Sequence, residues 1–221
     1  MTNLIAVIHY LDDKTSLLNA EIAAEADFKG VCLIHMNGED EKIENSAVQI
    51  KTRFPNMLVF TNRLNLPPYE MIIRDFNLGL DGSWSDNPGV SSTHITSTCR
   101  DIQHTLKDVW DTKSDYLFFG SVAFKYQEFE PYPDKAAFNV CELGWVATTS
   151  GPETGQPPLA EKLIKMKRAL GKNPLAVASG ISPENSEGLL PHVDWAFIAT
   201  GISSSFYKFD TSRTKLLKSM S

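Results

Sequence analysis

Cysteine, basic charge and long apolar runs are all scarce in this sequence of 221 residues. The only three cysteines are Cys32, Cys99 and Cys141, which are far apart and form no CxxC pair. A disulfide framework and a zinc ribbon are therefore not expected. The 21 Lys and Arg residues are outnumbered by 27 Asp and Glu, for a net charge of −6. This balance lacks the broad basic surface typical of proteins that bind nucleic acids. We expect a cytoplasmic protein with no nucleic-acid partner.

No segment has the features of a signal peptide or a membrane span. The first apolar run, residues 4–10, has no basic region before it and is followed by Asp12 and Asp13. It is also far shorter than the roughly 20 apolar residues that a spanning helix needs. We expect no integral membrane segment, whereas composition leaves association with a membrane surface open.

Short apolar runs rich in Val, Ile, Phe and Ala recur along the chain. They are continuous and do not alternate with polar residues, as is typical of strands that are buried on both faces of a parallel sheet. The predicted strands cover residues 4–9, 30–36, 57–62, 80–84, 116–121, 145–149, 174–179 and 195–200.

Stretches with helical periodicity lie between these runs. Four are clear: residues 16–26, 43–54, 159–170 and 210–220. In the third, the periodicity predicts that Lys162, Lys165 and Lys167 face water. Eight βα units favour a closed (β/α)8 TIM barrel over an open doubly wound sheet, whose common forms have five or six strands. Since no change in composition marks a linker, we expect one α/β domain over residues 1–221.

The active site of such a barrel lies at the carboxyl ends of its strands. The loops after the last two strands are rich in glycine and hydroxyl side chains, which suit a phosphate, and barrels often bind phosphate between these loops. The alternative is that Ser182 caps a helix, Pro183 begins it and Gly201 forms a turn. The predicted phosphate-binding residues are Ser179, Gly180, Ser182, Thr200, Gly201 and Ser203.

Two residues are candidates for catalysis. Lys125 follows an apolar stretch after the fifth strand, so its amine is expected to be partly desolvated and suited to holding an anion or acting as a base. Its alternative is a solvated surface charge. Asp86 follows the fourth strand and is the best candidate for a general base or a hydroxyl acceptor. Its alternative is an Asx-turn ahead of Pro88.

Four further residues are candidates for contacting a substrate. Thr149 and Ser150 begin a Gly- and Pro-rich loop that either folds over a ligand or simply connects two elements. Trp84 suits stacking on an aromatic ligand, and His9 suits acid–base chemistry, but both are also common core residues. Too few His and Cys residues converge to predict a metal site, and no pattern identifies a cofactor, so the cofactor is unknown.

The second half of the chain resembles the photosystem I biogenesis/SgcQ group of barrel proteins, known as the BtpA family. The resemblance is carried by residues 148–158, residues 179–185 and the turn at 199–202, together with Lys125 after the fifth strand and the ending that includes Arg213. It covers roughly the last 100 residues. Its Gly/Ser loops recur across ribulose-phosphate-binding barrels. The chain also looks somewhat like phosphoribosyl-handling barrels, except that His9 stands where the isomerase pattern has cysteine.

Two functions follow as hypotheses. The first is an enzyme that acts on a phosphorylated sugar or a nucleotide-like small molecule, with phosphoribosyl or glycosyl chemistry as one option. In this hypothesis the reaction class (transferase, isomerase or hydrolase) is left open. The second, implied by the family's biogenesis label, is a non-catalytic barrel that assists assembly of a membrane or protein complex. It predicts a large exposed apolar patch and no acid–base pair at the strand ends. Both are compatible with a homo-oligomer.

Overall fold

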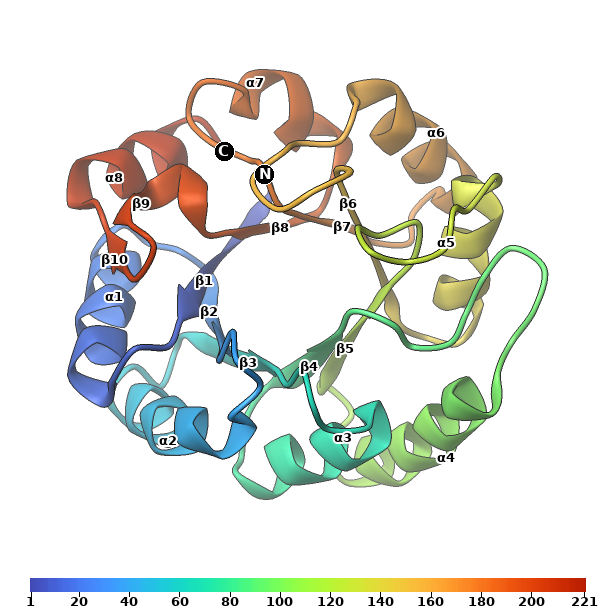
Figure 1. The fold of residues 1–221 in the computed structure, drawn as a ribbon, viewed down its shortest axis with the longest axis horizontal. Helices are drawn as coiled ribbons and strands as arrows, with labels where there is room; N and C mark the ends of the chain where they lie inside the picture. Colours follow the sequence, from blue (N-terminus) through green and yellow to red (C-terminus); the bar gives the residue numbers. More distant parts are fainter.

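Eight parallel strands close into a barrel in the computed structural model, which describes residues 1–221 (Figure 1). The first strand closes it, since Ala6 pairs with Val31 on one side and Ile198 on the other. The predicted (β/α)8 barrel is confirmed. The strands are β1 (Asn3–His9), β2 (Gly30–Ile34), β3 (Leu58–Asn62), β4 (Gly82–Ser85), β5 (Leu117–Ser121), β6 (Val146–Ser150), β7 (Leu175–Ala178) and β8 (Trp195–Ile198).

Helices surround the barrel on all sides (Figure 1). Asp12 begins the first of them by accepting a hydrogen bond from the main-chain N–H of Thr15, and Thr96 and Asp210 cap two others in the same way. The helices are α1 (Asp13–Glu25), α2 (Ile43–Arg53), α3 (Pro68–Asn77), α4 (Ser97–Thr112), α5 (Pro133–Glu142), α6 (Ala160–Leu170), α7 (Ser186–Leu189) and α8 (Thr211–Ser219), with short 3-10 turns at Asp40–Lys42, Leu190–His192 and Thr200–Ile202.

The helix after β7 begins later than the capping alternative for Ser182 predicts. α7 has only four residues and starts at Ser186, so Pro183 is not its first residue. The main-chain N–H of Ser182 instead donates to Asn185 Oδ1 at 2.9 Å, which closes a turn before the helix. The capping interpretation of Ser182 is therefore wrong.

Burial on both faces of each strand explains the continuous apolar runs. In β1, Leu4, Ala6 and Ile8 belong to the large core between barrel and helices, whereas Ile5 and Val7 point into the barrel. The barrel interior is filled by Phe60, Phe119 and Phe197. The ring of Phe119 lies 5.3 Å from that of Phe60 and 4.8 Å from that of Phe197, edge to face in both cases. This aromatic layer is the floor beneath the carboxyl ends of the strands.

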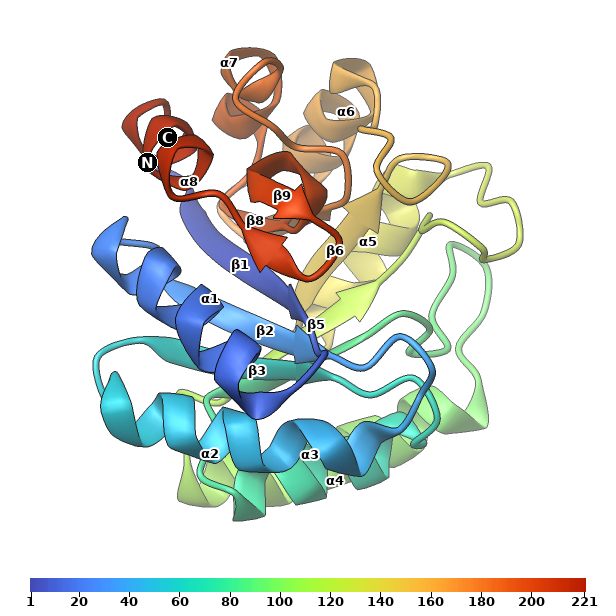
Figure 2. The same ribbon diagram turned by 60° about the vertical axis from the view of Figure 1, so that its left-hand side comes forward.

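A short hairpin extends the loop after β8. It consists of β9 (Ser203–Ser205) and β10 (Lys208–Phe209) and lies beside α1 (Figure 2). Asn19 of α1 holds it, donating to the carbonyl of Tyr207 at 2.8 Å and accepting from the N–H of Phe209 at 3.0 Å.

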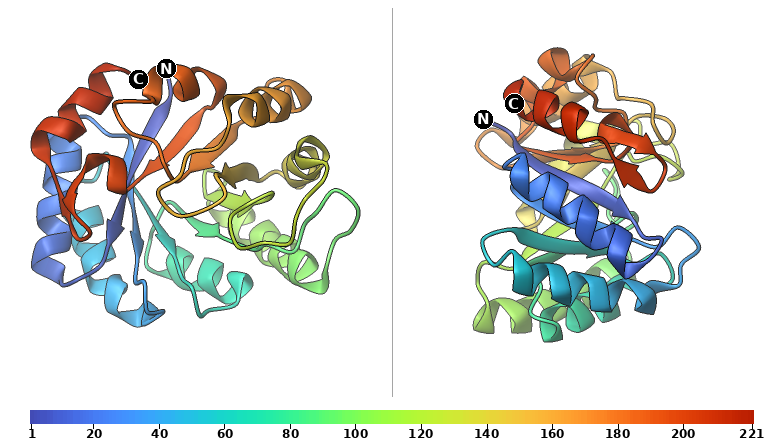
Figure 3. Two further views of the ribbon diagram at one scale, coloured as in Figure 1. Left: turned by 45° about the horizontal axis from the view of Figure 1, so that its top comes forward. Right: turned by 90° about the vertical axis from the view of Figure 1, so that its left-hand side faces the viewer.

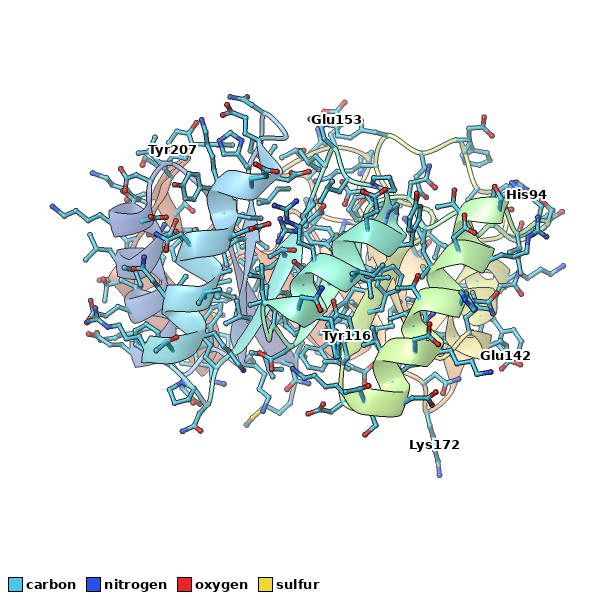
Figure 4. All side chains as sticks on the ribbon, turned by 90° about the horizontal axis from the view of Figure 1, so that it is seen from below. His94, Tyr116, Glu142, Glu153, Lys172 and Tyr207 are labelled. Carbon is cyan, nitrogen blue, oxygen red and sulfur yellow. The ribbon has the colours of Figure 1, made fainter.

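Both chain termini lie close together at the end of the barrel where the strands begin (Figure 3). The loops that follow the strands form the opposite end. Figure 4 shows this division, with Glu153 at the loop end and Lys172 at the other. None of the helices has the length and apolar character needed to cross a membrane.

Candidate active site at the barrel mouth

A cavity of about 220 Å³ opens at the carboxyl ends of the strands. Its walls combine apolar side chains from the barrel interior with a few polar groups from five or more loops. Such a mixture is typical of small-molecule sites. Seven of the residues predicted from the sequence line this mouth cavity: His9, Trp84, Asp86, Lys125, Ser179, Gly180 and Thr200.

Asp86 is held in place from two neighbouring loops. Its Oδ1 accepts a hydrogen bond from Asn62 Nδ2 at 2.9 Å, and its carbonyl accepts one from Gln127 Nε2 at 2.6 Å. Burial raises the pKa of Asp86, and the Asn62 hydrogen bond and the charge of Lys125 only partly oppose this rise. The Asx-type contact of this turn is made by Asn87, which accepts from the N–H of Gly89. The Asp86 carboxylate therefore faces the mouth cavity.

Lys125 approaches the same cavity from the loop after β5. Burial lowers the pKa of its amine, and the charge of Asp86 partly opposes this change. Its main-chain N–H donates to Ser150 Oγ at 2.7 Å, which fixes the loop. Ala123 and Tyr126 both adopt positive φ, 48° and 65°, a strained conformation that is concentrated at functional loops. Asp86 and Lys125 therefore line one cavity, where burial raises the pKa of the carboxyl group and lowers that of the amine.

His9 contacts the hairpin after β8. Its Nδ1 lies 3.1 Å from the carbonyl oxygen of Phe206, and its ring stacks on the Phe206 ring at 4.3 Å. A carbonyl only accepts, so Nδ1 carries the hydrogen, and Nε2 of the neutral imidazole is an acceptor. Burial is the main cause of the lowered pKa of His9, to which the charge of Lys125 contributes. Burial therefore favours the neutral form of the His9 imidazole, although the hydrogen bond to Phe206 acts in the opposite direction.

Trp84 forms part of the floor of the mouth. It is 5% exposed, and its Nε1 donates to Ser121 Oγ at 2.9 Å. Its ring meets that of Phe124 edge to face at 5.9 Å and lies 4.9 Å from that of Phe197. Only a small part of the indole reaches the cavity, so Trp84 mainly sets its depth.

The loops after β7 and β8 meet, and a second cavity of about 280 Å³ lies between them. A Cβ atom on Gly201 would lie 1.9 Å from the carbonyl oxygen of Ile181, which shows how closely the two main chains approach. Gly180, Ser182, Thr200 and Gly201 line this cavity, which is named the phosphate-loop cavity after the sequence prediction, and Gly180 and Thr200 line the mouth cavity as well.

The main chain of the loop after β7 has unused donors. The N–H groups of Ser179, Gly180 and Ile181 donate to no acceptor in the chain. Ser179 and Gly180 have φ of 87° and 73°. These N–H groups are therefore available to donate to a ligand at this turn.

Ser203 and Arg213 are placed differently from expectation. Ser203 lines neither cavity, and its Oγ donates to the carbonyl of Ala199 at 2.8 Å. Arg213, to which the sequence analysis assigned no site role, lines the phosphate-loop cavity. Its guanidinium donates to the carbonyl of Gly201 at 3.1 Å and to Glu184 at 3.0 Å, and it lowers the pKa of Glu184 to about 2. Arg213 lies three residues after Asp210, the N-cap of α8, and this local sequence does not predict the contacts with Gly201 and Glu184.

Thr149 and Ser150 are buried and support loops. Thr149 Oγ1 donates to the carbonyl of Ala123 at 3.1 Å, and Ser150 Oγ donates to the carbonyl of Gly151 at 2.8 Å. Neither residue lines the mouth cavity. Ser150 instead lines a cavity of about 920 Å³ between the loops after β5 and β6.

Lys162 does not face water as its helical position predicts. Its Nζ is half-buried and donates to the carbonyls of Ala123 and Ser150 at 2.6 and 2.8 Å. Burial lowers its pKa to about 8. The prediction is wrong because two loops fold over the first turn of α6. Helix periodicity shows only which side of α6 packs against the barrel.

Asn62 and Asp75 are two polar residues to which the sequence assigns no specific role, although Asn62 is among the strand-end positions expected at the active site. Asn62 is the last residue of β3, which pairs with β4, the strand that precedes Asp86. Its position at a strand end is the sequence feature from which a place in the site could be predicted. Asp75 lies in the core and accepts hydrogen bonds from Arg63, Thr61 and Ser83, away from the mouth. No group of three or more His, Cys, Asp or Glu side chains is arranged to hold a metal ion.

Comparison with known proteins supports the fold. No known family model matches the chain, and no curated protein sequence matches it. Among solved structures, a 3-hexulose-6-phosphate synthase is 15% identical, with a TM-score of 0.74 and 99% of both chains covered.

Two further solved structures are similar over nearly the whole chain, with somewhat lower TM-scores. Phosphoribosyl anthranilate isomerase from Thermus thermophilus is 12% identical with a TM-score of 0.67, over 100% of this chain and 98% of that one. KGPDC from Streptococcus mutans is 13% identical with a TM-score of 0.70, over 99% of this chain and 96% of that one. At these identities the likeness shows that the chain is a TIM barrel.

Proposed function

We propose that this protein is an enzyme that acts on a phosphorylated sugar or nucleotide-like small molecule. The observation that carries the proposal is the shared mouth cavity of Asp86 and Lys125, whose pKa values are shifted in opposite directions by burial. Groups with pKa values moved toward neutrality are suited to proton transfer.

The phosphate would lie in the phosphate-loop cavity. The main-chain N–H groups of Gly180 and Ile181 would donate to it, with hydroxyl groups of Ser182 and Thr200 nearby, while Ser179 lines the adjoining mouth cavity. Because Gly180 and Thr200 line both cavities, a ligand with its phosphate there extends directly into the mouth. The three similar structures include two whose names refer to phosphorylated sugar compounds, which supports this ligand class.

In the mouth, Asp86 would accept a proton from the substrate and Lys125 would stabilise negative charge that develops on it. The neutral imidazole of His9 offers Nε2 as an acceptor for a substrate hydroxyl. Fixed donors and charges of this kind need no reorganisation during the reaction and supply most of the rate.

A thermal-shift screen tests ligand binding. Phosphorylated sugars and nucleotides are compared with their dephosphorylated forms at fixed salt. A ligand present at 100 times its dissociation constant adds about 2.7 kcal/mol to the free energy of unfolding. Compounds that stabilise the protein are then assayed for turnover with wild type, Asp86→Asn and Lys125→Met. Stabilisation independent of the phosphate group, or equal turnover in all three proteins, contradicts the proposal.

The non-catalytic alternative has one observation in its favour. Tyr126, Phe129 and Leu159 are 80%, 90% and 75% exposed, and they lie around the cavity between the loops after β5 and β6. Exposed apolar side chains in one region are a feature of binding surfaces. This alternative, together with membership of the BtpA family, predicts that a phosphorylated ligand binds without being converted. The Asp86–Lys125 pair favours the enzyme.

A further inference from the structure

The largest of the three cavities lies outside the mouth. Its volume is about 920 Å³, and it is formed by the loops after β5 and β6 where they pass the start of α6. The two loops run side by side at this edge of the barrel (Figures 1 and 3). The volume is in the range of sites that hold a small organic molecule.

Lys162 is the distinctive group in this loop 5–6 cavity. Its ammonium donates two hydrogen bonds, both to main-chain carbonyls, which leaves one N–H without an acceptor. The next lysines along α6 are neutralised, Lys165 by Asp134 at 3.0 Å and Lys167 by Asp194 at 2.8 Å. Lys162 has no carboxylate at ion-pair distance, and burial is the only cause of its lowered pKa. A half-buried charge with no counter-ion favours an anion beside it.

The carboxylates that line the cavity do not neutralise this charge. Glu130 is turned away, because its two oxygens accept from the main-chain N–H groups of Ser92 and Tyr132, each at 2.9 Å. Glu128 is exposed and forms no ion pair within 4.0 Å. Lys125 also lines the cavity, but Asp86 in the mouth partly offsets its charge, so Lys162 is the buried cation of this cavity that has no counter-ion.

The rest of the wall is largely apolar. Phe129, Tyr126 and Leu159 are the exposed large side chains described above, and several prolines of the two loops also line the cavity. Aromatic side chains exposed on a loop provide flat surfaces against which a ring can pack. The strained φ angles of Ala123 and Tyr126 lie in the same loop, which Lys162 holds through the Ala123 carbonyl.

We propose that the loop 5–6 cavity is a second ligand site, which takes a small molecule carrying one anionic group and an aromatic ring. Lys162 donates its remaining N–H to the anionic group, while Phe129 and Tyr126 cover the ring. Because Lys125 and Tyr126 line both this cavity and the mouth, the ligand lies next to the active site. The proposal does not depend on the function proposed for the mouth.

Anilinonaphthalenesulfonate is a suitable probe, since it combines aromatic rings with a sulfonate and fluoresces when bound. We expect saturable binding to the wild type and at least about tenfold weaker binding to Lys162→Met, because a hydrogen bond to a charged group contributes about 1.5–3 kcal/mol. Arg168→Met, an exposed cation on the same helix outside the cavity, should bind as the wild type does.

Two further measurements separate a lost site from a disturbed fold. Lys162→Met removes a link between two loops, so its Tm is recorded, and Phe129→Ala is tested beside it. Phe129 is 90% exposed, so its loss should weaken binding without lowering Tm. Phenylnaphthylamine, which lacks the sulfonate, should bind more weakly to the wild type and should not distinguish Lys162→Met from it.

Equal binding of both probes by the wild type and the two cavity variants overturns the proposal, because the dye would then report only general apolar surface. Displacement of the dye by millimolar inorganic phosphate to the same degree from Lys162→Met and from the wild type would also overturn it, because phosphate would then compete at a site that does not include Lys162. Retained binding in the presence of phosphate supports a separate site, whatever the outcome of the turnover assays.

Discussion

Asn62 Nδ2 lies 2.9 Å from Asp86 Oδ1, and this hydrogen bond joins the carboxyl ends of β3 and β4. It holds the carboxylate at the mouth of the barrel and favours its charged form. Burial acts in the opposite direction and prevails, so the pKa of Asp86 is raised. The site therefore keeps a carboxylate whose ionisation is costly, a common property of groups that transfer protons.

Replacing Asp86 with Asn should separate stability from activity. Because the folded protein binds the Asp86 proton more tightly than the unfolded chain does, the contribution of Asp86 to stability falls as pH rises from the unfolded pKa through the folded one. Asp86→Asn removes this dependence, so its free energy of unfolding at pH 7 should equal or exceed that of the wild type. Under the proposed function, kcat/KM should fall about 10²- to 10⁴-fold.

Urea denaturation at pH 4 and pH 7 checks the stability part. Asp108→Asn, an exposed change on α4, is the control and should follow the wild type at both values. A clear loss of stability at pH 7 in Asp86→Asn alone would show that the carboxylate is stabilising and would contradict the raised pKa.

Lys125→Met should raise the pKa of His9. The ammonium of Lys125 contributes to the lowered pKa of this histidine, although burial is the larger cause, so removing it should move the pKa only part of the way toward 6.5. NMR titration of the imidazole measures the change. Lys172→Met, at the opposite end of the barrel (Figure 4), should leave the pKa of His9 as it is. An unchanged pKa in Lys125→Met would mean that the two groups are not electrostatically coupled at the mouth.

Gly201→Ala should weaken both the fold and phosphate binding. The added methyl group would lie 1.9 Å from the carbonyl oxygen of Ile181, so the loops after β7 and β8 must separate. Overpacking of this kind costs about 1–3 kcal/mol. Gly188→Ala is the matched control, because a Cβ there meets nothing within 4 Å and alanine favours the helix by up to about 1 kcal/mol. Thermal unfolding with and without a phosphorylated ligand measures both effects, and equal Tm values for the two variants would contradict the close contact.

Asp75→Asn should be the most destabilising of these changes. Arg63 donates to Asp75 from Nε at 3.0 Å and from Nη2 at 2.8 Å, and both side chains are fully buried. The amide cannot balance the guanidinium, which then keeps only Glu44 as an ion-pair partner. Breaking a buried pair in this way costs about 3–5 kcal/mol. Chemical denaturation beside the exposed control Asp101→Asn measures the loss, and a value below about 1 kcal/mol would show that the pair is not needed.

Strand positions were predictable because a parallel barrel buries both faces of every strand. The predicted run 116–121 and the observed β5, Leu117–Ser121, differ by one residue. Even the short, polar β4 was found, although the structure places it slightly later, at Gly82–Ser85. Its serines are tolerated because Ser83 bonds Asp75 inside the core.

The candidate site was predictable only as far as strand ends identify it. Asp86 and Lys125 could be selected because each follows a strand, and the structure brings both to the mouth cavity. The roles of Thr149 and Ser150 could not be predicted in this way, because a side chain at a strand end points either into the mouth or toward a neighbouring loop. Both of these side chains bond to loop carbonyls. Lys162 is the corresponding case on a helix, because its position on the predicted water-facing side of α6 does not show that two loops cover it.

By itself, the order of apolar runs and helical periodicity determined that this chain forms a closed (β/α)8 barrel, since burial of apolar surface depends mainly on pattern. Only the tertiary structure decided which polar groups meet. Asn62 reaches Asp86, Arg213 reaches Glu184 and Lys162 reaches two carbonyls because loops from different βα units pack against one another. Hydrogen bonds depend on distances of a few tenths of an ångström and on direction, and the local sequence does not carry this information.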